Sequence, residues 1–439
     1  MKNHLKKSHY HADMLSVEEA RQRIISKFHI LDKEDSSILD TLGQVIAEDI
    51  YSKVSVPPLD NSAMDGFALK NEDIVSASET NVVYLNVVET IEAGRIPKKK
   101  ILKGEASRIM TGAVIPEGAT TVVPFEDTDE NQQNESNITK IGIKLKTEKF
   151  ENIRTAGEDI KSGEKILSKG DIVSSSVIGI SASIGMDKIP VFRRPKIGVL
   201  STGNELLSPG DKIQPGKIFD SNTYTISSLI KSYGAIPIIE KFSKDNVIEI
   251  ESKIKKFENI DLIVTSAGVS KGDYDVVKEI MENKGEINFW SVNMRPAKPL
   301  AFGYVIVKNK QIPFIGLPGN PVSAMIALDK FARFAINKMM GKPFLDRPVI
   351  KAKLDSDIIN YDDRRFYARV YVYRNSENII CARPLENQSS GVLTSMHYAN
   401  GLGICPSSIN KLYKDEIIDV EMFNWNENIT EIINPKKDI

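Results

Sequence analysis

The feature that most constrains the fold is a pattern that occurs three times between residues 196 and about 340. A short apolar run, KIGVL, DLIVT or IPFIG, leads into a loop with glycine, and a helix-like stretch follows. Strands that alternate with helices predict a parallel sheet with helices on both faces. Because ligands bind beyond the carboxyl ends of the strands in such sheets, we expect the three loops to line one site.

Other patterns flank this central region. SVEEARQRIISKF (16–28) and SSSVIGISASIG (174–185) predict helices that begin at serine caps. From about 53 to 150, short runs such as VVYLNVVETI and TKIGIKLK are typical of strands. After Gly341 the chain returns to β-type runs such as YDDRRFYARVYVYR. The order of these patterns predicts several domains.

Composition agrees with a multidomain soluble protein. A chain of 439 residues is too long for one ordinary core, so roughly three domains are expected. The net charge of −1 predicts no general attraction to nucleic acid or membranes, and no apolar run approaches the roughly 20 residues of a membrane span. The amino-terminal stretch lacks the apolar region of a signal peptide, and the two cysteines, Cys381 and Cys405, fit a reducing compartment. We expect a cytoplasmic protein.

The second loop allows two interpretations. Residues 268–272, GVSKG, match the G-x-S-x-G pattern of a serine-hydrolase nucleophile elbow. That mechanism needs a histidine after Ser270 in the chain, and only His397 follows, in the separate carboxy-terminal β region. An anion-binding loop is therefore favoured over a hydrolase.

The anion-site interpretation rests on three segments that follow predicted strands: Ser201-Thr202-Gly203, Ser266-Ala267-Gly268 and Leu317-Pro318-Gly319-Asn320. Glycine lets backbone N–H groups approach a phosphate closely, and a helix amino terminus adds a favourable partial charge. Four acids lie on or just after these loops: Glu205, Asp220, Asp273 and Asp275. Each of these acids taken alone could cap a helix. Taken together, the four could bind a Mg²⁺ ion that also contacts a phosphate of the substrate.

Eight motifs occur in a specific order along the chain. They are PPLDNSAMDGFAL (57–69), IMTGAVIPEGATTVV (109–123), TAGEDIKSGEKIL (155–167), STGNELLSPG (201–210), GKIFDSN (216–222), SAGVSKGDYD (266–275), MRPAKPLAFG (294–303) and LPGNPVSA (317–324). This series resembles the MoeA family of molybdopterin molybdenumtransferases, which includes the gephyrin carboxy-terminal domain. The resemblance covers residues from about 16 to 425.

The resemblance implies a reaction in molybdenum cofactor biosynthesis. Adenylylated molybdopterin and molybdate are the implied substrates and Mg²⁺ the implied cofactor. Cleavage of the phosphoanhydride releases AMP and leaves molybdenum on the dithiolene. A homodimer with its active site at the subunit interface is implied. A molybdopterin adenylyltransferase and apo-molybdoenzymes are further partners that the resemblance leaves open.

The resemblance also implies a multidomain α/β plus β fold. A central α/β domain with a mostly parallel sheet (191–345) binds molybdopterin. An elongated helix and β region (14–52 and 150–190) carries an inserted β-rich domain (53–149), and a small β domain (346–439) ends the chain.

The motifs of the family assign roles to residues of this chain. The implied catalytic residues are Asp60, Glu205, Asp245 and Asp275, and the implied metal ligands are Glu205, Asp273 and Asp275. The implied substrate-binding residues are Thr111, Asp159, Ser201, Thr202, Gly203, Asp220, Ser266, Gly268, Ser270, Gly272, Pro318, Gly319, Asn320 and Ser323. The implied molybdate-binding residues are Arg295, Lys298, Arg369 and Ser390. Plain alternatives are a turn for Asp60, a surface loop for Asp245 and a solvated basic loop for the pair Arg295 and Lys298.

Some positions depart from the family pattern. The chain has Arg295-Pro296-Ala297-Lys298 where Lys-Pro-Gly-Lys is usual, and Ser291 replaces a basic residue. Arginine keeps the charge but replaces a point donor with a planar fork. These changes leave the choice between molybdate and tungstate open.

Two other functions fit parts of the pattern. A molybdopterin adenylyltransferase would share the central α/β unit but would not need the first 190 residues. A non-catalytic scaffold of the same fold would need none of Asp60, Glu205, Asp275 or Lys298, and all four are present.

Overall fold

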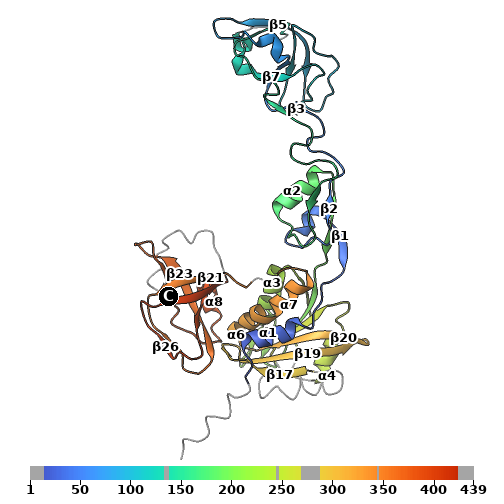
Figure 1. Cartoon of the computed structure of the whole chain (residues 1–439). Helices are drawn as coiled ribbons and strands as arrows, with labels where there is room; N and C mark the ends of the chain where they lie inside the picture. The colour runs from blue at the N-terminus through green and yellow to red at the C-terminus, as the bar shows by residue number, and fades with distance from the viewer. Residues whose placement is uncertain (1–13, 133–137, 244–246, 268–286, 344–345, 424–439) are drawn as a thin grey trace, which may run out of the picture. The chain divides into compact units, whose positions relative to one another are not determined.

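The computed structural model describes residues 14–132, 138–243, 247–267, 287–343 and 346–423 (Figure 1). The chain forms two compact units. The first contains the described residues of Met1–Glu34 and Phe192–Ile439, and the second is Asp35–Val191. The chain crosses between them at β1 (Lys33–Ser37) and β11 (Lys188–Phe192). The boundaries predicted inside each unit stay predictions.

The core of the first unit is a six-stranded sheet in the order β15-β12-β16-β20-β19-β17. Its strands are β12 (Lys196–Ser201), β15 (Ile236–Ile239), β16 (Leu262–Ser266), β17 (Ile287–Ser291), β19 (Pro299–Val307) and β20 (Lys310–Leu317). The first four strands of that order run parallel, and β19 and β17 add an antiparallel edge. The three apolar runs of the sequence pattern form β12, β16 and β20.

Helices cover both faces of this sheet (Figure 1). They are α1 (Val17–Ile25), α3 (Asn222–Ser232), α4 (Val247–Ile254), α6 (Pro321–Ala327) and α7 (Arg333–Met339), and a π-helical turn, η5 (Leu328–Ala332), joins the last two. Alternate residues of one strand serve opposite faces, since Val199 packs with α1, α3, α6 and α7 while Leu200 packs with α4. Burial on both faces explains why these strands are continuous apolar runs.

The predicted serine cap of the first helix is confirmed. Ser16 is the residue before α1, and its side chain accepts a hydrogen bond of 3.0 Å from the backbone N–H of Glu19. The helix that the sequence predicts after β16 lies outside the described residues. None of the helices in the described part of the chain combines the length and apolar character needed to cross a membrane.

The rest of the first unit is a closed β-sheet near the carboxyl end of the chain. Its strands are β18 (Met294–Arg295), β21 (Val349–Leu354), β23 (Arg365–Arg374), β24 (Ile380–Pro384), β25 (Gly401–Cys405) and β27 (Ile417–Met422). Because β23 pairs with both β24 and β25, the sheet closes on itself around its own apolar core. Shorter elements here are β22 (Ile358–Ile359), β26 (Lys411–Leu412) and α8 (Thr394–Tyr398). We call residues 347–423 the C-terminal barrel domain.

The second unit holds a five-stranded sheet in the order β7-β4-β6-β5-β8. Its strands are β4 (Gly66–Leu69), β5 (Val83–Ile91), β6 (Glu105–Ile109), β7 (Thr121–Pro124) and β8 (Lys140–Ile143). Between this sheet and the crossings lie β2 (Ile50–Tyr51), β3 (Asn61–Ser62), β9 (Ile153–Arg154), β10 (Lys165–Leu167) and α2 (Ser175–Ser183). Ser174 caps α2 as predicted, since its side chain accepts from the N–H of Val177.

Two glycines of the second unit make a matched test of this packing. A Cβ added at Gly66 would lie 2.0 Å from the backbone oxygen of Val123, on the neighbouring strand, whereas one added at Gly179 in α2 would meet nothing within 4 Å. We expect Gly66→Ala to cost about 1–3 kcal/mol, because the two strands must separate. Gly179→Ala should stabilise by about 0.5–1 kcal/mol through helix propensity. Urea denaturation of both variants measures the difference, and equal stabilities would contradict it.

Candidate active site

A cavity of about 750 Å³, lined by both polar and apolar residues, lies beyond the carboxyl ends of β12, β16 and β20. The three strands are in register so that Ser201 pairs with Ser266 and Ser266 with Leu317. The loops that follow therefore start at one level of the sheet. Nine of the predicted site residues line this cavity: Ser201, Thr202, Glu205, Asp220, Ser266, Pro318, Gly319, Asn320 and Ser323.

Gly203 lets the loop after β12 fold tightly. Its φ angle is +156°, a conformation that is rare for other residues, and its N–H donates to the backbone oxygen of Ser243 over 3.0 Å. An added Cβ would lie 2.6 Å from a carboxylate oxygen of Glu205. The absence of a side chain at Gly203 thus leaves the space that the Glu205 carboxylate occupies at the cavity wall.

Asp220 is buried and its carboxylate is used within the protein. One oxygen accepts from the N–H of Thr223 over 3.0 Å, and the other accepts from the Thr223 hydroxyl over 2.6 Å. A hydroxyl contact of 2.8 Å joins Thr223 to Ser201. Asp220 therefore fastens the start of α3 to the end of β12, which is the capping role considered from the sequence.

Asn222 joins two of the loops. Its side-chain amide donates to the hydroxyl of Ser266 over 2.7 Å and to the backbone oxygen of Gly319 over 2.6 Å. Thr202 is 4% exposed, lines the cavity, and its hydroxyl has no hydrogen-bond partner in the described part of the chain. Because a buried hydroxyl without a partner is costly, Thr202 is a natural donor or acceptor for a ligand.

The C-terminal barrel domain supplies another wall of the same cavity through Gly391 and Leu393. The hydroxyl of Ser390 accepts from the side chain of Asn320 over 3.0 Å, and its backbone oxygen accepts from the N–H of Val322 over 3.1 Å. The loop of the barrel domain is thus hydrogen-bonded to the start of α6. Sequence reasoning selected Ser390 but missed Gly391 and Leu393, because the spacing there shows no recognisable pattern.

Arg295 lies in a second cavity, of about 510 Å³, which Ser389 and Phe366 also line. Its guanidinium carbon is 3.8 Å from the centre of the Phe366 ring, and one of its nitrogens is 3.8 Å from a carboxylate oxygen of Asp362. Burial lowers the pKa of Arg295, which Asp362 partly offsets. Ser389 thus lines the second cavity, with Arg295, and Gly391 lines the first, so the segment 389–391 borders both.

Arg369 is fully buried and holds this segment in place. It donates to the backbone oxygens of Asn387 and Ser389 over 3.3 and 3.1 Å, and to the hydroxyl of Ser395 over 3.2 Å. Its remaining nitrogen, Nη1, has no partner among the described residues. Burial, with a smaller contribution from Arg295, lowers the pKa of Arg369 to about 10, so it is still a cation at neutral pH.

The fourth predicted molybdate residue, Lys298, precedes Pro299, which lines the first cavity. The backbone oxygen of Lys298 accepts a hydrogen bond of 2.8 Å from the N–H of Val292. Of the four predicted molybdate residues, Arg295 lines the second cavity, and Ser390, Arg369 and Lys298 lie next to or in contact with residues that line one of the two cavities.

Three predicted residues belong to the second unit. A carboxylate oxygen of Asp60 accepts from the N–H of Ala156 over 2.7 Å. Thr111 donates to Asp65 from its N–H and its hydroxyl, over 2.6 and 2.8 Å, and these bonds hold the pKa of Asp65 below its usual value. Asp159 is exposed, and its N–H donates to the backbone oxygen of Val56.

The remaining predictions lie outside the described residues. They are Asp245, Gly268, Ser270, Gly272, Asp273 and Asp275. Within the described ranges, no group of three or more histidine, cysteine, aspartate or glutamate side chains is arranged to hold a metal ion. Glu205 is the exposed carboxylate on the cavity wall, since Asp220 is bound by Thr223.

Comparison with known proteins assigns nearly the whole chain to three family regions. Residues 15–185 match the MoeA N-terminal region (domains I and II), residues 198–338 a probable molybdopterin binding domain, and residues 351–423 the MoeA C-terminal region (domain IV). The chain is 33% identical over 403 residues to molybdopterin molybdenumtransferase 2 of Mycobacterium tuberculosis, which covers 90% of this chain and 96% of that protein.

The chain belongs to the MoeA family.

Other relatives extend the match. The molybdopterin molybdenumtransferase of Staphylococcus epidermidis is 34% identical over 424 residues, or 95% of this chain and 98% of that protein. Among solved structures, the MoeA protein of Pyrococcus horikosii has a TM-score of 0.74 at 29% identity and covers 94% of this chain and 100% of that one. The family and the division into N-terminal, central and C-terminal regions predicted from the motifs are confirmed. In this MoeA chain the 750 Å³ cavity lies within the central and C-terminal regions.

The bridge made by Asn222 can be tested directly. We expect Asn222→Asp to cost about 1–3 kcal/mol, because a carboxylate can no longer donate and would face the backbone oxygen of Gly319. Asn288→Asp, at an exposed position on β17, is the matched control and should change stability by less than about 0.5 kcal/mol. Urea denaturation measures both, and similar stabilities would show that the bridge contributes little.

Proposed function

We propose that this chain inserts molybdenum during molybdenum cofactor biosynthesis, by Mg²⁺-dependent cleavage of adenylylated molybdopterin and transfer of molybdate to the dithiolene, with release of AMP. Its place in molybdenum cofactor biosynthesis follows from the MoeA family match over nearly the whole chain. The observation that carries the reaction is the cavity at the strand ends, with its polar loop residues. Its volume of about 750 Å³ falls within the range of small-molecule sites.

The loops around the cavity supply the groups that an adenylylated substrate needs. The unpartnered hydroxyl of Thr202 offers a hydrogen bond to a phosphate oxygen. Gly319 lets the backbone of the third loop approach an anion closely. Asn222 holds the second and third loops together, so these groups are in place before the substrate binds.

Glu205 is the described residue that fits a Mg²⁺ ion. Mg²⁺ commonly takes one or two protein carboxylates and fills its other positions with water and substrate phosphate. The carboxylate of Glu205 is exposed at the cavity wall, whereas both oxygens of Asp220 accept bonds from Thr223. When bound, the ion would neutralise charge on the phosphoanhydride. Asp273 and Asp275 complete the proposed set on the strength of the motif.

Molybdate is a dianion, so its site needs cations or hydrogen-bond donors. Arg295, Lys298, Arg369 and Ser390 remain the proposed set. Arg369 supports this because it is a buried cation with one unpartnered nitrogen, beside the segment that carries Ser390. Arg295 contributes a charge that Asp362 partly neutralises.

The assembly is also part of the proposal. We assign Asp60, Thr111 and Asp159 to the active site of a partner subunit in a homodimer, because the family motifs place them there. A molybdopterin adenylyltransferase is the expected supplier of the substrate, apo-molybdoenzymes the expected recipients, and the cytoplasm the expected compartment.

Glu205 gives a test with a matched glycine pair. We expect Glu205→Gln to slow AMP release at least about tenfold, since the amide is a poor ligand for Mg²⁺. Gly203→Ala should slow it as well, because the new methyl group displaces the Glu205 carboxylate. Gly210→Ala is the control: its φ is also positive, at +98°, but an added Cβ meets nothing within 4 Å. AMP release from adenylylated molybdopterin, Mg²⁺ and molybdate is the measurement. An unchanged rate for Glu205→Gln would refute the role of Glu205, and equal rates for the two alanine variants would refute the role of Gly203 in placing its carboxylate.

Lys298 tests the oxyanion site separately. We expect Lys298→Ala to raise the molybdate concentration needed for half-maximal AMP release about tenfold, because a cation near a dianion is lost. The affinity for AMP, measured by calorimetry, should change little. Lys310→Ala, an exposed lysine at the start of β20, should change neither quantity. Equal losses in oxyanion use and AMP affinity would count against the assignment.

A further inference from the structure

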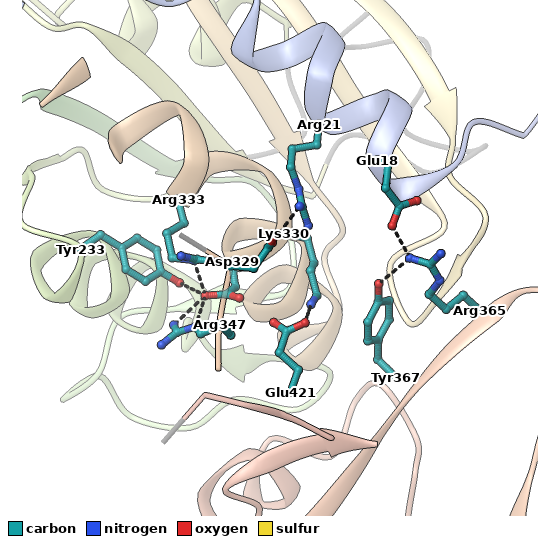
Figure 2. Close-up of polar contacts among 11 residues, drawn as sticks. Glu18, Arg21, Tyr233, Asp329, Lys330, Arg333, Arg347, Arg365, Tyr367 and Glu421 are labelled. Carbon is teal, nitrogen blue, oxygen red and sulfur yellow. Dashed lines mark hydrogen bonds and ion pairs between the residues drawn. The ribbon is translucent and has the colours of Figure 1, made fainter. Parts of the chain in front are cut away.

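Two adjacent charged residues in the middle of a helix are buried. Asp329 and Lys330 lie on the π-helical turn η5, and their exposed fractions are 8% and 2% (Figure 2). Charged residues are rarely this buried unless they are paired. A π-helical turn inserts an extra residue into a helix and often occurs at functional positions. The question is what these two charges hold.

Asp329 holds the two ends of the C-terminal barrel domain. One of its carboxylate oxygens accepts from Arg347 over 2.6 and 3.1 Å and from the hydroxyl of Tyr233 over 3.1 Å, and Arg333 lies 3.1 Å from it (Figure 2). Arg347 precedes the first strand of the barrel, and it also donates to the backbone oxygen of Phe423, just after the last strand. Asp329 therefore connects the central domain to the entry and the exit of the barrel.

Lys330 contacts the wall of the barrel. Its ammonium forms an ion pair with Glu421 on β27 and lies 4.4 Å from the centre of the Tyr367 ring on β23 (Figure 2). Next to Tyr367, Arg365 of β23 forms an ion pair of 2.5 Å with Glu18 of α1. Asp329 and Lys330 together thus connect the central domain to the entry, the exit and two strands of the C-terminal barrel domain.

The same helix contacts the barrel domain at a second place. Asn320 and Val322, at the start of α6, hydrogen-bond to Ser390. About ten residues separate the two contact points, which is about 15 Å along a helix. One contact would leave a domain free to rotate about it, whereas two contacts this far apart leave only rotation about the line that joins them. The ion pair between Arg365 and Glu18 adds a third contact, on another helix. The orientation decides whether segment 389–391 reaches the cavity wall.

The energetics argue against simple stabilisation by the Lys330–Glu421 pair. Burial lowers the pKa of the Lys330 ammonium more than Glu421 and Asp329 raise it. The protein environment therefore disfavours its charged form relative to water. Replacement of a buried ion pair by apolar side chains is often neutral or stabilising, while such pairs can select one arrangement over others.

We propose that Lys330, through its ion pair with Glu421, is a positioning residue that sets the orientation of the C-terminal barrel domain on the central domain and so holds segment 389–391 at the wall of the active-site cavity. Asp329 fastens the two ends of the barrel domain beside this pair. The consequence for catalysis rests on the proposed function. The orientation itself does not, and can be measured without substrate.

The test replaces both members of the pair, so that no buried charge is left alone. In Lys330→Met/Glu421→Met, cysteines at 320 and 390 are joined by a short bifunctional thiol reagent, and the rate of joining reports the orientation. The cysteines remove the side-chain bond between Asn320 and Ser390 equally from the parent, the variant and the control, while the backbone bond from Val322 to Ser390 remains. Both native cysteines are buried. The matched control is Lys351→Met/Asp419→Met, which removes an exposed ion pair of 2.7 Å between the neighbouring strands β21 and β27.

We expect the cross-linking rate to fall at least about fivefold in the Lys330 variant and to be unchanged in the control. Without the added cysteines, the Lys330 variant should melt within about 5 °C of the parent. It should need about tenfold more molybdate for AMP release, with unchanged AMP affinity, because the central-domain walls are intact.

An unchanged cross-linking rate would overturn the inference, and so would a loss of thermal stability well beyond 5 °C, which would make the pair a stabilising one. If the cross-linking rate falls but neither parent nor variant releases AMP, the orientation role stands and the proposed function fails.

Discussion

The common level at which β12, β16 and β20 end is the constraint on which the site depends. The register of the strands places Ser201 beside Ser266 and Ser266 beside Leu317. The three strands therefore end at the same edge of the sheet. Among the described residues, α3 follows the loop after β12 and α6 follows the loop after β20. A shift of one residue in register would turn each strand's side chains to the opposite face and misalign the loops. The cavity is therefore a consequence of sheet pairing.

A second domain adds a wall to the site at this edge. Gly391 and Leu393 of the barrel domain line the cavity, and Ser390 bonds to the start of α6. The barrel is closed around its own core, so it can act as a rigid body on the central domain. Which residues of the barrel domain line the cavity then depends on the orientation of that domain. The contacts of Asp329, Lys330, Asn320 and Val322 all come from one continuous helical stretch.

Buried charge has different uses in different parts of this molecule. Both carboxylate oxygens of Asp220 accept hydrogen bonds from Thr223, and these bonds fasten the start of α3. Arg369 donates three hydrogen bonds, two to backbone oxygens of the loop 387–389 and one to the hydroxyl of Ser395. Its Nη1 atom has no partner among the described residues. Glu205 is exposed, and Gly203 leaves room for its carboxylate. The residue type alone does not distinguish the roles of Asp220, Arg369 and Glu205. Their roles differ because their side chains have different numbers of hydrogen-bond partners within the protein.

The sequence by itself determined the local features and the family. Apolar runs predicted β12, β16 and β20, serine caps predicted the starts of α1 and α2, and the ordered motifs predicted MoeA membership. These features depend on neighbours within a few residues or on a shared motif. Only the tertiary structure decided that Asn222 bridges two loops, that Arg369 is buried, and that Lys330 pairs with Glu421, 91 residues away. A charged pair within a helical pattern normally indicates a solvated face, and it is buried here because another domain packs against it.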